Sequence, residues 1–167
     1  ILVNYRGLVL GFMLNNRTDA NANNKIRLTR DGQTVSSGKV VYADKQTNTS
    51  VILIDNAEGL ETPYVLADAY PLPGTVLYLN GNTEDGNLFV AANKFDKRSL
   101  DNGYLNFRSN ISRSQYGSAV IDENGKLFGI AIKGSSVDFN TLRTMLTQGV
   151  ANILVDKDIR THEINLS

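Results

Sequence analysis

Few residues of this chain carry side chains that could do chemistry, and their types limit what that chemistry could be. The chain holds one histidine, His162, and no cysteine, which excludes thiolate nucleophiles and cysteine-based metal sites. A lone histidine beside Glu163 is more typical of a solvated side chain than of a metal ligand or a pH sensor. We therefore expect no metal and no cofactor.

Two pairs of neighbouring carboxylates are the next candidates, Glu84 with Asp85 and Asp122 with Glu123. Both pairs occur in turn-like sequence, where acidic side chains commonly bond to the backbone of the turn. A glycosidase-like carboxylate pair or a calcium site is the alternative, but neither spacing matches a known calcium loop. Turn chemistry is therefore the favoured interpretation.

Residues 111–130, ISRSQYGSAVIDENGKLFGI, form the most informative segment. A tight turn at residues 115–118 has Tyr116 directly before its glycine, and a short apolar strand follows at residues 119–121. A hairpin turn at residues 122–125 then predicts a second apolar strand at residues 127–132. The segment therefore predicts a turn–strand–turn–strand unit with a tyrosine on its first turn.

Strand periodicity dominates the rest of the chain. A first series of β-rich runs covers residues 1–4, 8–14, 26–29, 39–42 and 51–54. A second series covers residues 76–79, 88–91, 104–107, 118–121 and 127–132. Short strands at this spacing indicate an all-β barrel or sandwich. We expect two lobes, residues 1–82 and 83–167, with the boundary in the polar stretch at residues 81–86.

One helix is predicted near the C-terminus, at residues 138–148. Four apolar residues fall on one face at helical spacing, namely Phe139, Leu142, Met145 and Leu146. Ser136 or Asp138 can cap the start of this helix, and Gly149 can end it.

Charge and hydropathy exclude several classes of partner. The chain has 17 Lys and Arg against 17 Asp and Glu, so its formal net charge is zero and it has no basic stripe for nucleic acid. No apolar run approaches the ~20 residues that a membrane-spanning helix needs. Residues 1–14 lack a basic leader and a cleavage site, and they predict strands rather than a signal peptide. Because the chain starts without Met in strand-like sequence, we expect a processed product or a fragment.

Three separated segments resemble the HtrA branch of the trypsin-like serine proteases. Residues 105–132, LNFRSNISRSQYGSAVIDENGKLFGIAI, are similar to that family's nucleophile region. Residues 40–54, VVYADKQTNTSVILI, are similar to its catalytic-aspartate segment, and residues 6–16, RGLVLGFMLNN, resemble the strand that ends at its catalytic histidine. The resemblance implies an all-β chymotrypsin-like fold with two six-stranded-type barrels, trimmed at the N-terminus, and one short helix near the C-terminus.

The family's catalytic histidine position falls at approximately Leu14 in this chain. Its aspartate position is occupied by Asn48 and its serine position by Tyr116. A triad needs a hydroxyl nucleophile, an imidazole base and a carboxylate that orients the imidazole. A phenol with a pKa of about 10 is a poor acyl acceptor, and an amide cannot stabilise an imidazolium by charge. Residues 1–82 contain no histidine, and Ser114 stands where the family has its oxyanion-hole glycine. The resemblance therefore implies a pseudoprotease and not an enzyme.

The function implied by the resemblance is that of a non-catalytic domain serving as a protein-interaction or structural module, with other proteins or peptide segments as partners. A domain that binds peptides or ligands at the former catalytic cleft is the alternative, because strand addition needs backbone groups rather than a triad. An enzyme of another kind, using Tyr116, Arg113 or the acidic turn residues, is less favoured, as is an unrelated β-sandwich binding domain. By analogy with HtrA-like proteins, we expect a location outside the cytoplasm, in a periplasm, envelope or organelle.

Overall fold

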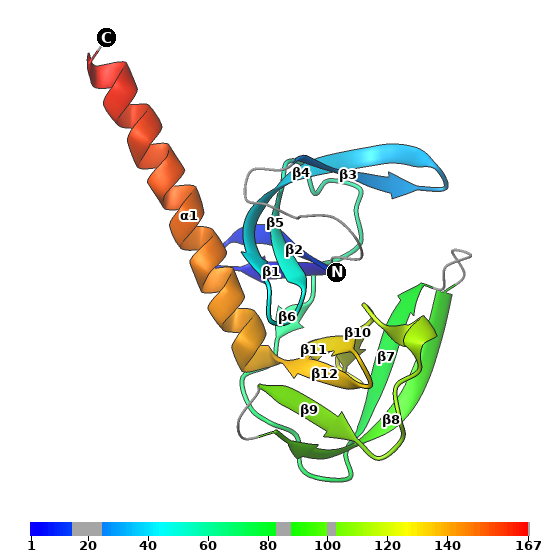
Figure 1. The fold of residues 1–167 in the computed structure, drawn as a ribbon. Helices are drawn as coiled ribbons and strands as arrows, with labels where there is room; N and C mark the ends of the chain where they lie inside the picture. The colour runs from blue at the N-terminus through cyan, green and yellow to red at the C-terminus, as the bar shows by residue number, and fades with distance from the viewer. Residues whose placement is uncertain (15–24, 83–87, 100–102, 167) are drawn as a thin grey trace. The chain divides into compact units, whose positions relative to one another are not determined.

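The computed structural model describes residues 1–14, 25–82, 88–99 and 103–166, with the backbone alone for residue 82 and residues 156–166 (Figure 1). The first strands are β1 Leu2–Tyr5, β2 Leu8–Leu14, β3 Lys25–Arg30, β4 Gln33–Asp44, β5 Thr49–Ile54 and β6 Val65–Leu66. The later strands are β7 Val76–Asn82, β8 Leu88–Arg98, β9 Tyr104–Phe107, β10 Ala119–Ile121, β11 Lys126–Ile132 and β12 Ser135–Asp138. A short 3₁₀ helix, η1, covers Arg113–Gln115, and one α-helix, α1, covers Phe139–Leu166.

The chain forms two compact units. Unit 1 consists of Ile1–Leu8 and Thr62–Arg143, and unit 2 consists of Val9–Glu61 and Thr144–Ser167. This division differs from the expected lobes at residues 1–82 and 83–167. The physical reason is the pairing of β7, which lies between β8 and β10 in the later sheet and therefore belongs to the same barrel.

Unit 1 contains a closed six-stranded barrel, seen in green to yellow in Figure 1. Its strands follow the order β10-β7-β8-β9-β12-β11, and the pairing of β10 with β11 closes it. The short strand β6 adds to β11 in parallel. Closure leaves the barrel without unpaired edges, which is how many antiparallel sheets satisfy their backbone groups.

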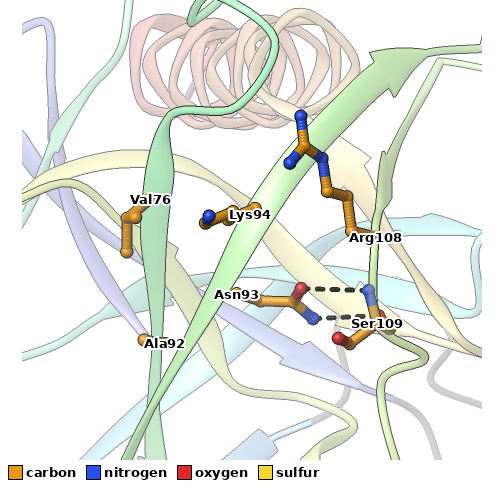
Figure 2. A pocket seen from close by; sticks show the side chains of 6 residues that line it. All are labelled: Val76, Ala92, Asn93, Lys94, Arg108 and Ser109. Atoms are coloured by element: carbon orange, nitrogen blue, oxygen red, sulfur yellow. Dashed lines mark hydrogen bonds between the residues drawn. The ribbon is translucent and has the colours of Figure 1, made fainter.

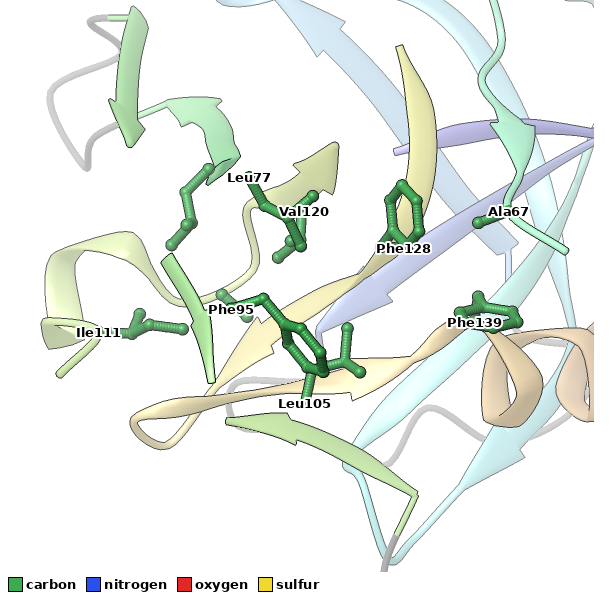
Figure 3. Packing of buried hydrophobic residues seen from close by; sticks show 10 residues of the cluster. Ala67, Leu77, Phe95, Leu105, Ile111, Val120, Phe128 and Phe139 are labelled. Atoms are coloured by element: carbon green, nitrogen blue, oxygen red, sulfur yellow. The ribbon is translucent and has the colours of Figure 1, made fainter. Parts of the chain in front are cut away.

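Apolar side chains from all sides of the barrel fill its interior (Figure 3). Ten buried residues form this core cluster: Ala67, Leu77, Leu79, Phe95, Leu105, Ile111, Val120, Phe128, Ala131 and Phe139. Leu77 and Leu79 are alternate residues of β7 and lie on the same face, because successive side chains of a strand point to opposite faces. Phe139 joins this core from the first turn of α1, and its ring meets that of Phe128 edge to face at a centroid distance of 6.1 Å.

Strands β2 to β5 of unit 2 lie in a five-stranded sheet of order β1-β2-β5-β4-β3. The buried apolar residues of the unit include Leu10, Phe12, Val40, Val51 and Ile54. The sequence predicted a second closed six-stranded barrel, whereas the described residues form this five-stranded sheet. The all-β class with a single C-terminal helix is the expected one, and the closed barrel of unit 1 is one of the two expected barrels.

The helix α1 is longer than predicted. It has 28 residues and continues through Gly149, which was expected to end it. Gly149 is buried and helical, and a Cβ atom at this position would lie 3.1 Å from Val41 Cγ2 and 3.2 Å from Val51 Cγ1. The glycine therefore allows the helix to approach β4 and β5 closely, which is a packing role rather than a helix stop.

The start of α1 is the predicted one. Asp138 Oδ1 accepts a hydrogen bond of 2.9 Å from the amide of Thr141, three residues on, as an N-cap residue does. Of the two predicted caps, Asp138 is therefore the one in use, while Ser136 donates to the Val137 carbonyl. In the part of the chain that the structure describes, no helix combines the length and the apolar character that a membrane span needs.

Candidate functional site

The loop before β10 carries the residue at the nucleophile position. Residues 113–115 form η1, Tyr116 follows with φ −64° and ψ 139°, and Gly117 adopts φ +87°. The left-handed φ explains the glycine, because other residues rarely adopt it. The predicted turn and the two strands after it are therefore confirmed in unit 1.

Four consecutive backbone amides of this loop, those of residues 115–118, all donate hydrogen bonds inside unit 1. Their acceptors are the carbonyls of Ser112, Arg113, Ala131 and Gln115, at 2.9, 3.2, 2.7 and 3.2 Å respectively. The Ser118 hydroxyl also donates to the Gln115 carbonyl, at 2.7 Å. The amide of Tyr116 is therefore held by the 3₁₀ turn rather than directed at a ligand.

The ring of Tyr116 is half-buried and packs against the barrel core cluster. This contact accounts for an aromatic residue at the position, since an exposed loop gains nothing from a large apolar surface. Arg113 and Ser114, one turn earlier, are exposed. The loop therefore combines a half-buried tyrosine with an exposed polar segment.

The other two candidate positions lie together in unit 2. Leu14 ends β2 and lies opposite Thr49 of β5, the residue that follows Asn48. Asn48 is exposed with φ +55°, a left-handed conformation that asparagine adopts more readily than most residues. The nearby carboxylate, Asp44, accepts bonds from the Thr47 amide at 3.1 Å and the Thr47 hydroxyl at 2.5 Å. The only acidic group of this turn thus stabilises the turn itself.

The remaining predicted candidates lie partly inside and partly outside the residues that the structure describes. Asp122 Oδ1 accepts hydrogen bonds of 2.9 Å from the amides of Asn124 and Lys126, which confirms turn chemistry for this carboxylate. Glu84 and Asp85 lie outside the described residues, and so does the side chain of His162. Within the described ranges, no group of three or more acidic or histidine side chains is placed to hold a metal ion.

A polar network in unit 1 was not predicted. The Tyr70 hydroxyl donates to Asp138 Oδ2 at 2.7 Å and accepts from the Asn140 amide group at 3.2 Å. The Arg98 guanidinium lies 4.6 Å from the centre of the Tyr70 ring. Burial and the bond to Asp138 raise the pKa of the Tyr70 phenol above its ordinary value. Asp138 is only 2% exposed, so this network satisfies a buried carboxylate.

A shallow groove on the outside of the barrel was also not predicted (Figure 2). Its volume is about 390 Å³, and it is lined by Val76, Ala92, Asn93, Lys94, Arg108 and Ser109. Asn93 forms two hydrogen bonds with the backbone of Ser109, at 2.9 and 3.3 Å. The lining comes from three segments that pairing brings together, so no single stretch of sequence marks it. The one sequence signal is β8, in which apolar residues occupy both faces from Leu88 to Ala92.

Solved structures with a similar fold are serine proteases. The inactive form of the Rv3671c protease has a TM-score of 0.64 at 15% identity, covering 87% of this chain and 80% of that one. The serine endoprotease from Yersinia pestis has a TM-score of 0.61 at 20% identity, covering 73% of this chain and 47% of that one. The HtrA-type protease AlgW, solved with a decapeptide, has a TM-score of 0.55 at 22% identity, covering 71% of this chain and 42% of that one.

These similarities establish the fold. It is the trypsin-like fold of HtrA-type protease domains, as the resemblance implied. This chain spans less than half of the Yersinia pestis and AlgW chains, at 47% and 42% of their lengths. No protein-family model and no curated protein matches the sequence.

Proposed function

We propose that this chain is a catalytically inactive trypsin-like domain that serves as a protein-interaction or structural module. The proposal starts from the three catalytic positions, where Leu14, Asn48 and Tyr116 provide neither a base, nor a carboxylate, nor a good nucleophile. The fold similarity to HtrA-type proteases supports the choice of these positions.

The observation that carries the proposal is the state of the Tyr116 loop. An oxyanion hole needs backbone N–H groups aimed at the developing charge of the substrate. Here the amides of residues 115–118 all donate to carbonyls of the same unit. An acyl-transfer site would have to break at least the bond from the Tyr116 amide before it could stabilise an oxyanion.

The packing of Tyr116 favours docking through an outer surface over binding at the former nucleophile position. Its ring contacts the barrel core cluster, so moving it aside would expose apolar surface to water. Peptide binding at that position is therefore the less favoured candidate. By fold analogy with HtrA-type proteases, we also propose a location outside the cytoplasm.

The first test is peptidase activity with a fluorescent casein substrate. We expect no turnover from the native sequence and none from the single variant Tyr116→Ser, because a restored hydroxyl still lacks a base. Loss of a triad lowers the turnover number by a factor on the order of 10⁶, so casein hydrolysis by this site should be too slow to detect. Thermal melting of the variant checks that it is folded, and an active trypsin-like protease in the same buffer checks the assay.

The matched control is Tyr116→Ala, which removes the same ring without adding a hydroxyl group. Casein turnover by Tyr116→Ser that Tyr116→Ala lacks would overturn the proposal, because it would reveal a working base. Equal and undetectable turnover by all three sequences is the expected result.

A further inference from the structure

We propose that the outer face of the β7–β8 ribbon is a docking surface for an apolar, acidic segment of a partner protein. This inference rests on the proposed interaction function and names the surface and the chemistry of the partner. The surface has two parts. The outer strip consists of Val76, Tyr78, Leu88, Val90 and Ala92, and the cationic end consists of Lys94 and Arg108.

The outer strip is apolar where a solvated sheet face is normally polar. Leu88 is 79% exposed, Val90 68% and Val76 39%, whereas Leu77 and Leu79 on the opposite face are almost completely buried. An antiparallel sheet with one face in water usually alternates apolar inward residues with polar outward ones. The outward residues of β8 are apolar instead of polar, although they do not contribute to the barrel core.

Strand pairing places the residues of β8 beside both apolar and polar residues of β7, with Val90 opposite Asn80 and Leu88 opposite Asn82. In the antiparallel register of β7 with β8, Tyr78 lies opposite Ala92 and Val76 lies opposite Lys94. Directly opposed side chains on one face have Cβ atoms about 5 Å apart. From Lys94 to Leu88 the outward face extends for about 20 Å at the usual rise of an antiparallel strand. Along β8, Leu88, Val90 and Ala92 form a continuous exposed apolar row. Exposed apolar surface bordered by polar residues marks interaction sites in soluble proteins.

The cationic end provides the charge complementarity. Val76, Ala92, Lys94 and Arg108 line the same groove of about 390 Å³. The Arg108 amide donates to the Lys94 carbonyl at 3.0 Å, which holds the two basic residues on adjacent segments. Within the described residues, neither the Lys94 ammonium nor the Arg108 guanidinium has a hydrogen-bond or ion-pair partner. Two unpaired cations beside an apolar strip favour a carboxylate next to apolar side chains.

The carboxylate is assigned to an Asp or Glu side chain of the partner rather than to its C-terminus. Capture of a chain terminus commonly uses a nest of free backbone amides. Here the Arg108 amide donates to Lys94, and the Ser109 amide donates to Asn93 Oδ1. The cationic groups that line the groove are the Lys94 ammonium and the Arg108 guanidinium, and side-chain carboxylates suit them.

The test uses the full chain, labelled with ¹⁵N, and a synthetic hexapeptide with blocked ends, Glu-Leu-Ser-Val-Ser-Leu. We expect saturable chemical-shift changes that map to β7, β8 and residues 108–109. The charge-reversed variant Lys94→Glu with Arg108→Glu should bind this peptide at least tenfold more weakly and should bind the Lys-Leu-Ser-Val-Ser-Leu peptide more tightly than the native sequence does. Val90→Ser, which leaves the cations intact, should also weaken binding at least threefold.

The matched control is the variant Arg30→Glu with Lys45→Glu, which reverses two exposed cations of unit 2. Its affinity for the glutamate peptide should stay within twofold of the native value. No shift changes at about 1 mM peptide, changes that map away from β7–β8, or equal binding of the glutamate and lysine peptides would each overturn the docking surface. None of these outcomes affects the peptidase test, so the failure of this inference is distinguishable from the failure of the inactive-domain proposal.

Discussion

At the scale of single residues, local backbone geometry explains several side chains that chemistry alone would leave unexplained. Asn48 occupies a left-handed turn position, and Asp44 caps the same turn through Thr47. Tyr116 packs against the barrel core cluster, and the next residue, Gly117, has φ +87°. Each of these residues therefore has a structural role that does not depend on catalysis.

Tyr70 provides a prediction at this scale, because its pKa is raised by burial and by its bond to Asp138. In alkaline solution the unfolded phenol ionises first, at a pH of about 10, while the folded phenol keeps its proton. The folded state then binds more protons than the unfolded state, so this contribution to stability is present below that pH and is lost as the pH rises further. We expect the free energy of unfolding to fall in this range, and Tyr70→Phe to remove part of the fall.

Denaturant unfolding at pH 7 and at a series of alkaline pH values measures this effect. At pH 7 the loss of the Tyr70 hydroxyl should destabilise the chain by about 1–2 kcal/mol, because the buried Asp138 carboxylate loses one donor. Tyr5→Phe serves as a control, because it removes a phenol from a different element, β1. An alkaline slope that is identical in the native chain and Tyr70→Phe would contradict the assignment.

At the scale of elements, α1 shows how tertiary packing extends a helix beyond its local signals. Its buried residues Met145, Leu146 and Ile153 belong to unit 2, and Asn152 donates to the Val41 carbonyl at 2.6 Å. Glycine inside a helix is unfavourable by about 1 kcal/mol relative to alanine, so Gly149 must be offset by close contact with β4 and β5. Packing energy outweighs helix propensity here.

Gly149→Leu tests this explanation of the helix. A leucine side chain at the contact with Val41 and Val51 overpacks unit 2, and we expect a loss of about 1–3 kcal/mol in the free energy of unfolding. Gln148→Leu is the matched control, because Gln148 directly precedes Gly149 in α1 and its side chain is exposed. This substitution should change the free energy of unfolding by no more than about 0.5 kcal/mol. Equal effects of the two substitutions in denaturant unfolding would rule out the close-packing role of the glycine.

At the scale of the whole molecule, each unit has its own buried apolar residues. The trypsin-like fold is shared with proteases at 15–22% identity, a range in which a common fold does not imply a common activity. Function must therefore be argued from particular surfaces. The surface with the clearest features among the described residues is the outer face of β7 and β8.

An interaction module should be found with its partner in its natural source. We predict that the native particle containing this chain, isolated under mild conditions, is larger than the chain itself and contains a second protein in fixed stoichiometry. Native mass spectrometry measures the particle mass, and peptide mass fingerprinting identifies the partner. A free monomer would contradict a structural role in an assembly and would shift the weight to transient peptide capture.

The sequence by itself determined most of the strands, the Tyr116 turn and the start of α1, whereas β6 and β12 were not predicted. It did so because strand alternation, turn residues and capping groups are local properties that neighbouring residues decide. The strand at residues 8–14 matches β2 along its whole length, and Asp138, one of the two predicted caps, caps the helix. The candidate positions Leu14, Asn48 and Tyr116 were likewise named from local segments, and their loss of catalytic function remains a prediction.

The tertiary structure alone decided the features that depend on residues distant in sequence. It placed β7 in the later barrel, carried α1 past Gly149, and joined residues 76, 92–94 and 108–109 into one groove. Sheet pairing and helix packing depend on which surfaces meet, and a linear pattern does not contain that information. A glycine that can end a helix can equally allow it to pack closely, and only the presence of Val41 and Val51 beside Gly149 selects the second role.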